Sequence, residues 1–190
     1  MPEADVGKFE GWVEVIVRDK NGRIKYHIKP AFIEKCEDGE HCNTLSILSP
    51  SFPAELVEYY WRKNVITNAG LAAIVRLVFS GLTENKFGYI AIGTGTTAES
   101  VNDTALQNEI KRKAATVTQT TTSVTGDTAL LEATFSSADG LSGSSNVSEA
   151  GVFNASTGGI LLARKVFSAV PLNWDAGDSI TIRYYIQMSR

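Results

Sequence analysis

The feature that most constrains the fold is a series of short strand-type segments in the second half of the chain. From residue 87 onwards, β-branched and aromatic residues gather in runs that are bounded by Gly, Asn, Asp or Ser at roughly ten-residue spacing. In the last run apolar and polar residues alternate, as in Ile180, Thr181, Ile182 and Arg183. This pattern predicts an antiparallel β-sandwich rather than an alternation of strands and helices.

Six strands are expected in this region, with tight turns at Thr125–Asp127 and Thr157–Gly159 and a turn over Asp175–Asp178 into the last strand. The predicted strands are Phe87–Ile92, Ala115–Val124, Ala129–Phe135, Ser148–Phe153, Ile160–Phe167 and Ser179–Met188. The polar stretch that starts at Asn102 is expected to form one helical turn through Leu106 and Ile110.

The N-terminal region predicts a β-hairpin over Gly11–Ile28, with Asn21 and Gly22 between its two arms. Asn-Gly favours a type I′ turn, because that turn needs positive φ at both central residues. In the second arm, Ile24, Tyr26 and Ile28 alternate with basic residues, so one face is expected to be buried and the other wet. The later segment Glu55–Trp61 fits a short helix or a strand equally well.

One helix is predicted over Asn68–Ser80, with Thr67 as its N-cap and Gly81 after its end. Its apolar stripe has helical spacing and is expected to lie on a sheet; it consists of Leu71, Ile74, Val75, Val78 and Leu82. A soft boundary near Asn64 then divides the chain into a hairpin arm, 1–62, and a jelly-roll-like β-sandwich module with one helix, 63–190.

Composition excludes two classes of partner. The 18 Lys and Arg against 21 Asp and Glu give a net charge of −3, whereas nucleic-acid-binding domains carry a basic patch. No run approaches the roughly 20 apolar residues that cross a bilayer. The first residues, Met1–Gly11, lack the basic and apolar regions of a secretory signal. We therefore expect no nucleic acid and no membrane as partners, and synthesis in the cytoplasm.

Cys36, His41 and Cys42 are weak candidates for a metal site, because their spacing fits none of the common zinc modules. A disulfide between the two cysteines is a second interpretation, and a pair of free thiols beside a polar loop is the third and the one that the sequence favours. No cofactor is predicted.

No residue is predicted to be catalytic. Nucleophilic catalysis needs a base beside the nucleophile, and neither His27 nor His41 accompanies a Gly-x-Ser-x-Gly elbow. Gly93–Thr97 follows a strand but lacks the third glycine of a dinucleotide-binding turn, so its glycines are expected to form a tight strand exit. Glu149 interrupts an apolar strand and is therefore expected to be buried or at an interface.

Three tryptophans, Trp12, Trp61 and Trp174, are candidates for a carbohydrate-binding platform. Because tryptophans are usually mostly buried, packing in the core or in an interface is the favoured interpretation.

Segments from Lys63 to Arg190 resemble, in order and spacing, a module of tailed-phage virion proteins of the tail, baseplate or tail-fibre-associated type. The segments that carry the resemblance are TNAG (Thr67–Gly70), IGTGTTA (Ile92–Ala98), DTAL (Asp103–Leu106) with Glu109 and Arg112, EAGVFN (Glu149–Asn154) and SITIRYYI (Ser179–Ile186).

The resemblance implies a non-enzymatic structural component of the virion that packs against other virion proteins and against copies of itself, as a homotrimer. A capsid decoration protein is the alternative of the same class. A carbohydrate-binding module that attaches to a host glycan is the alternative of another class. Residues 1–62, outside the resemblance, would then form an arm that contacts a neighbouring subunit.

Overall fold

A computed structural model describes residues 8–30, 57–60, 64–79 and 84–189. Within these ranges the chain contains eleven strands, one α-helix and a short 3₁₀ helix. The elements are β1 (Lys8–Arg18), β2 (Ile24–Pro30), β3 (Val57–Tyr60), β4 (Val65–Ile66), α1 (Asn68–Phe79), β5 (Tyr89–Gly93), β6 (Glu109–Ala114), β7 (Thr116–Thr120), β8 (Thr128–Phe135), the 3₁₀ helix (Ser137–Asp139), β9 (Ser144–Phe153), β10 (Leu161–Asn173) and β11 (Ser179–Ser189).

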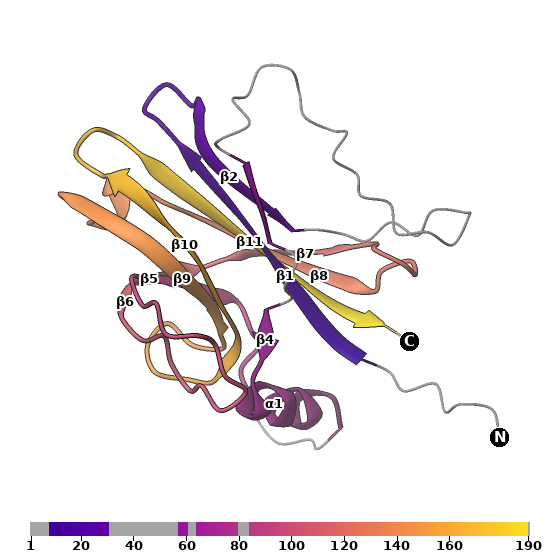
Figure 1. The fold of residues 1–190 in the computed structure, drawn as a ribbon. Helices are drawn as coiled ribbons and strands as arrows, with labels where there is room; N and C mark the ends of the chain where they lie inside the picture. Colours follow the sequence, from indigo (N-terminus) through magenta and orange to yellow (C-terminus); the bar gives the residue numbers. More distant parts are fainter. Residues whose placement is uncertain (1–7, 31–56, 61–63, 80–83, 190) are drawn as a thin grey trace.

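The strands form two sheets that face each other, which confirms the predicted β-sandwich with one helix (Figure 1). One sheet has the order β3-β2-β1-β11-β8-β7 and the other the order β4-β10-β9-β5-β6. All neighbouring strands are antiparallel except β3, which pairs with β2 in parallel. The segment that fitted helix or strand equally well therefore contains a strand, β3.

The N-terminal hairpin belongs to the sandwich, whereas the sequence suggested an arm outside it. β1 lies between β2 and β11 and pairs with β11 from Lys8↔Ser189 to Arg18↔Ser179. Its alternate residues Val13, Val15 and Val17 are buried in the same core as residues of the C-terminal strands. The boundary near Asn64 thus does not separate two cores. The reason is that the apolar face of β1 is buried by the module itself.

The turn of this hairpin also differs from the expected type I′ geometry. Only Gly22 has positive φ, 78°, and the N–H of Gly22 donates to the carbonyl of Asp19 at 2.9 Å. The Asp19 carboxylate accepts from the N–H groups of Asn21 and Arg23 at 2.8 and 3.0 Å. These bonds hold a type I turn that ends in a left-handed glycine, the other common hairpin geometry.

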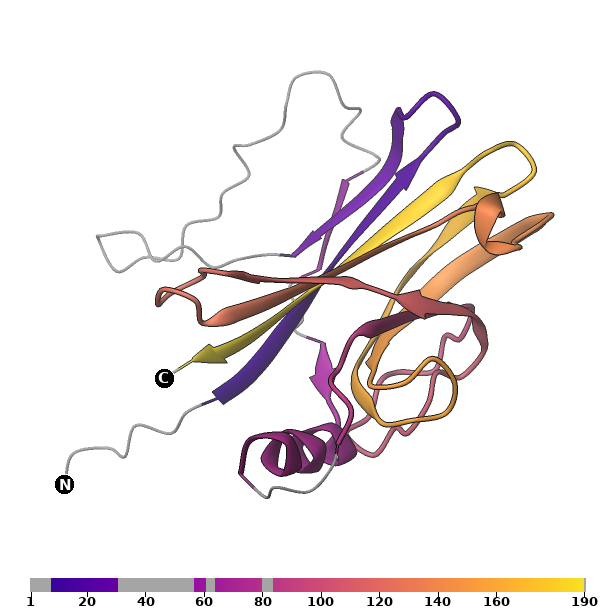
Figure 2. The same ribbon diagram turned by 180° about the vertical axis from the view of Figure 1, so that it is seen from behind.

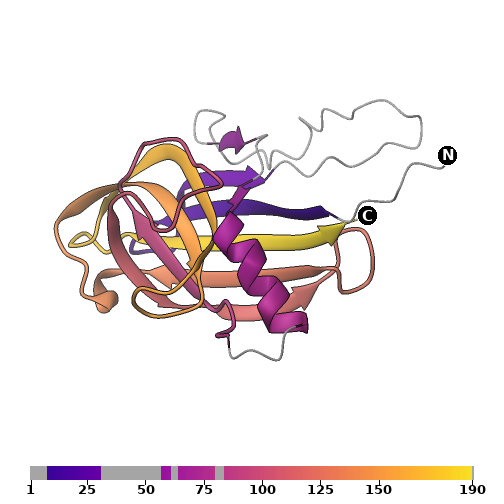
Figure 3. The ribbon, with the colours of Figure 1, turned by 90° about the horizontal axis from the view of Figure 1, so that it is seen from below.

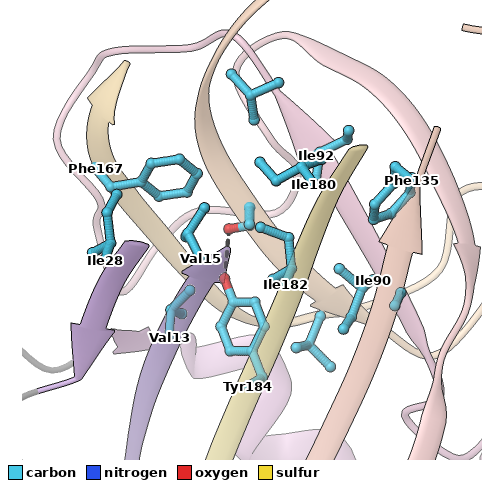
Figure 4. Close-up of a cluster of buried hydrophobic side chains, with 14 of the residues drawn as sticks. Val13, Val15, Ile28, Ile90, Ile92, Phe135, Phe167, Ile180, Ile182 and Tyr184 are labelled. Atoms are coloured by element: carbon cyan, nitrogen blue, oxygen red, sulfur yellow. Dashed lines mark hydrogen bonds between the residues drawn. The ribbon is translucent and has the colours of Figure 1, made fainter. Parts of the chain in front are cut away.

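Both sheets contribute to one hydrophobic core (Figure 4). The inward residues of β11, Ile180, Ile182 and Tyr184, are completely buried against residues of both sheets. The hydroxyl of Tyr184 donates to the carbonyl of Ala150, in the opposite sheet, at 2.7 Å. Burial raises the pKa of Tyr184 well above its usual value, so this phenol stays a hydrogen-bond donor.

Helix α1 confirms the predicted start and overturns the predicted face. The Thr67 hydroxyl accepts from the N–H of Gly70 at 2.9 Å, as an N-cap should. The fully buried helix residues are Gly70 and Ala73; of the expected stripe Ile74 packs against the core, whereas Leu71, Val75 and Val78 are exposed. Gly70 lies so close to the backbone of Leu162 that an added Cβ would be 2.7 Å from its Cα. This close approach fixes which side of α1 meets the sheet. Gly81 and Leu82 lie outside the described residues.

The region around Asn102–Ile110 forms turns and then β6, not the helical turn that was expected. Only Ala115 separates β6 from β7, so the chain passes from one sheet to the other at that residue. The predicted strand Ala115–Val124 therefore corresponds to β7 alone. β6, the edge strand of the other sheet, was not predicted from the sequence.

Candidate functional site

Three of the segments that carry the resemblance, Ile92–Ala98, Asp103–Leu106 and Glu149–Asn154, come together on the outer face of the five-stranded sheet, whereas Ser179–Ile186 lies in β11 of the other sheet. The chain after β5 folds back over this face, and Leu106 packs there against Ala91, Phe153 and Leu161. This loop and the β9–β10 connection lie at the same end of that sheet (Figures 1 and 2). Beneath the loop lies Glu149, which points away from the main core because it neighbours the inward-facing Ala150 in β9.

Glu149 is fully buried and accepts hydrogen bonds from three backbone N–H groups. The donors are Gly95 at 3.0 Å, Asn108 at 2.7 Å and Gln107 at 3.0 Å. The Arg164 side chain, on the neighbouring strand β10, adds two contacts to the same carboxylate, at 2.9 Å from Nε and 2.8 Å from Nη2. The expectation that Glu149 is buried is confirmed.

Arg164 extends this network into the loop. Its guanidinium also donates to the Asp103 carboxylate at 2.9 Å and to the carbonyl of Thr97 at 3.0 Å. Burial alone would lower the pKa of Arg164, but the hydrogen bonds to Asp103 and Glu149 raise it above its ordinary value. Arg164 therefore stays charged, as a buried partner of Glu149 must.

The two glycines of the Gly-Thr-Gly segment leave room for the Glu149 carboxylate. An added Cβ would be 2.6 Å from Glu149 Oε1 at Gly93 and 2.4 Å from the same atom at Gly95. The sequence interpretation of a tight strand exit agrees with this geometry but did not identify the group that needs the space.

The Glu149 network stabilises the fold, and the loop N–H groups that could bind a ligand already have partners within the protein. The N–H of Gly95 is bound by Glu149, and the N–H groups of Thr96 and Thr97 both donate to Gln107 Oε1 at 2.8 Å. A phosphate needs such N–H groups to be available, and here they are occupied. The network is a lock between the loop and the sheet.

A second polar cluster lies on the outer face of the six-stranded sheet. Glu14 Oε1 is 2.6 Å from His27 Nε2, and Glu14 Oε2 accepts from Arg183 and Tyr185 at 3.3 and 3.2 Å. Arg183 also pairs with Glu132. Burial raises the pKa of Glu14, but the contacts to His27 and Arg183 lower it more, for a net decrease. Burial and the Glu14 charge raise the pKa of Tyr185 to about 12.

In this second cluster Glu14, Arg183 and Glu132 alternate in charge across the neighbouring strands β1, β11 and β8. His27 is the histidine of this cluster that could act as a general base, and it contacts the Glu14 carboxylate. The described residues of this cluster include no serine or cysteine that His27 could activate. Cross-strand ion pairs of this kind stabilise a sheet modestly.

Cys36, His41 and Cys42 lie outside the described residues, and so does Trp61. Across the described ranges, no three His, Cys, Asp or Glu side chains are grouped as a metal site would require.

Two of the three consecutive basic residues Lys111, Arg112 and Lys113 form contacts within the fold. Arg112 stacks on the Phe153 ring at 3.4 Å from its centroid, and Lys113 Nζ is 2.5 Å from the Asp139 carboxylate.

The tryptophan candidates for sugar binding give little support to a platform. Trp174 is buried in the core, and its indole N–H donates to Ser145 Oγ at 3.0 Å. Trp12 is half-buried on the outer face of β1, opposite Tyr185. In the part of the chain that the structure describes, no helix is long and apolar enough to span a membrane.

Sequence reasoning missed two features. Arg164 could have been found, because it is a charge within the apolar run of β10, just as Glu149 is within β9. The second feature is the side of α1 that is not buried. We define the α1 apolar face as Leu71, Val75, Val78 and Phe79, whose side chains are between 40% and 80% exposed.

Comparisons with protein families, with curated proteins and with solved structures found no match for this chain.

Proposed function

We propose that this chain is a non-enzymatic structural component of a tailed-phage virion, associated with the tail, baseplate or fibres, that acts by packing against other protein subunits. The observation that carries the proposal is the α1 apolar face, which is exposed in the single chain. Large exposed apolar patches are rare on monomeric proteins and mark interaction sites.

The chemistry of the described residues supports this proposal. The buried carboxylate and guanidinium of the Glu149 network bind each other and the loop, so they are not free to act on a substrate. The Glu14 cluster likewise pairs its charges internally. A protein whose polar groups are used to hold its fold, and whose apolar helix is exposed, suits assembly better than catalysis. The assignment to a virion comes from the sequence resemblance, and so does the homotrimer.

Purified particles test the proposal. Phage particles should be isolated on a density gradient from a culture that produces this chain, and their proteins identified by mass spectrometry. We expect the chain to be present at a constant ratio to the major virion proteins. After heads and tails are separated, it should stay with the tails.

Recovery with the heads would instead favour the capsid decoration alternative. Complete absence from the particles, with the chain found only among unassembled proteins, would overturn the proposal.

A further inference from the structure

The α1 apolar face has a helical arrangement that suits contact with another helix. Leu71, Val75 and Val78 follow the spacing i, i+4, i+7, and Phe79 extends the face at the end of the helix. Side chains at these positions form one ridge on a helix surface. The opposite side of α1 is already used, because Gly70 and Ala73 are buried against the sandwich. Helix α1 lies at the margin of the molecule, below the strands in Figure 1 and in front of them in Figure 3.

The face carries no charge that could select a charged partner. The only ionisable residue of α1 is Arg76, which is half-buried and pairs with Glu84 at 2.9 Å. A partner with acidic or basic groups at this face would therefore lose their hydration without gaining an ion pair. The matching surface must itself be apolar and uncharged. The chain carries such a surface, namely the same face of another copy.

We infer that the α1 apolar face binds the α1 apolar face of a second copy of this chain. This inference rests on the proposed function, since it names the partner in subunit packing. A contact between identical surfaces closes with two-fold symmetry as a dimer, so it is a different contact from the one that would hold the homotrimer implied by the resemblance.

Area sets the expected strength of this contact. A standard interface buries about 800 Å² on each partner. Four partly exposed side chains supply less than that, so we expect reversible association in the micromolar range or weaker for the isolated protein. Additional contacts within a particle would strengthen it.

Sedimentation equilibrium over a wide concentration range tests the inference. The full chain should associate reversibly, and Val75→Lys and Val78→Lys should each shift it toward the monomer by at least tenfold in dissociation constant. Val124→Lys is the matched control, because Val124 is 53% exposed in the β7–β8 turn and Val75 is 55% exposed on α1. The control should associate like the unmodified chain. Circular dichroism should show that all three variants stay folded.

A cross-linking experiment locates the contact. In a Cys36→Ser, Cys42→Ser background, Val78→Cys should form a disulfide-linked dimer on mild oxidation, whereas Val124→Cys should not. A chain that stays monomeric at every concentration would overturn the inference. So would association that Val75→Lys and Val78→Lys leave unchanged.

Incorporation into particles separates this inference from the proposed function. If a monomeric chain is still found in purified tails, the proposed function stands and α1 does not bind a second copy. If the chain associates through α1 but is absent from particles, the inference stands and the virion assignment fails.

Discussion

Glu149 shows what one buried charge can organise. Its carboxylate binds the N–H groups of three loop residues and the side chain of Arg164, so it joins the loop after β5 to strands β9 and β10. Its burial could be predicted, because a lone acid in an apolar strand is costly unless it is paired. Its partners could not, because backbone N–H groups leave no mark in a sequence. Arg164 lies 15 residues away and becomes a neighbour only through the β9–β10 pairing.

We expect Glu149→Gln to destabilise the fold by about 3 kcal/mol, because it leaves the Arg164 charge buried with a weaker partner. Glu132→Gln is a matched control in which a partly exposed glutamate of a strand also loses its arginine partner, Arg183. Its cost should stay below about 1 kcal/mol. Urea unfolding measures both changes in the free energy of unfolding, and equal losses would contradict the lock described here.

Gly95→Ala tests the same lock from the loop side. Its Cβ would be 2.4 Å from Glu149 Oε1 and 2.5 Å from the Cβ of Gln107. Overpacking of this kind costs roughly 1–3 kcal/mol. Gly88→Ala is the control, because nothing lies within 4 Å of a Cβ added there. Neither glycine has a left-handed backbone, so a difference in melting temperature reports the contact alone. Equal melting temperatures would show that the loop shifts freely.

Asp127 predicts a pH effect. Desolvation raises its pKa, but the N–H groups of Thr122, Val124 and Ser123 and the amide of Gln187 bind the carboxylate and lower the pKa far more. The folded pKa therefore lies well below the ordinary 3.8. A depressed pKa stabilises the fold above the ordinary value, and this contribution is lost as the pH falls toward the folded pKa.

Asp127→Asn should thus lower the free energy of unfolding at neutral pH. The difference from the unmodified chain should shrink steadily as the pH is lowered below about 4. Urea unfolding across this pH range is the measurement. A difference that is independent of pH would mean that Asp127 acts through shape and not through charge.

At the scale of elements, strands were easier to predict than their partners. Alternation identified the N-terminal hairpin, but nothing in that pattern shows that β1 pairs with β11, which follows it by more than 150 residues. Helical spacing likewise identified the apolar stripe of α1. The stripe was expected to lie on a sheet, but most of it is exposed. Periodicity shows that a helix has an apolar side, whereas the close approach of Gly70 to Leu162 decides which side of the helix meets the sheet.

A chain that begins at Asn64 should fail to fold, contrary to the expectation of an independent module. It would lack β1, leaving the edge of β11 unpaired and removing Val13, Val15 and Val17 from the core. Far-UV circular dichroism and gel filtration should show an unfolded or aggregated chain. A synthetic peptide of residues 8–30 added during refolding should restore part of the native spectrum, because it supplies β1 and β2. A cooperative melt for the truncated chain alone would restore the interpretation of residues 1–62 as a separate arm.

At the scale of the whole molecule, polar and apolar groups have opposite roles. Buried charges of the described residues pair within networks, at Glu149 and at Glu14, whereas five of the nine exposed large hydrophobic residues lie on α1. The fold class followed from strand spacing, and the networks depend on contacts that only the folded chain creates. This arrangement supports the proposed role in packing against other subunits.

The single shared core predicts that the described fold unfolds in one step. Residues of β1 and β11 in one sheet and of β5, β9 and β10 in the other contact each other, and Tyr184 links the sheets through Ala150. Neither sheet can therefore keep its buried face after the other is lost. Urea unfolding followed by far-UV circular dichroism and by tryptophan fluorescence should give coincident curves. Trp12 reports on β1 and Trp174 on the core between the sheets.

Tyr184→Phe should move both curves together to lower urea, with the free energy of unfolding lower by about 1 kcal/mol or somewhat more, because the Ala150 carbonyl loses its donor. Separate midpoints for the two probes would mean that the N-terminal hairpin unfolds independently of the module behind it.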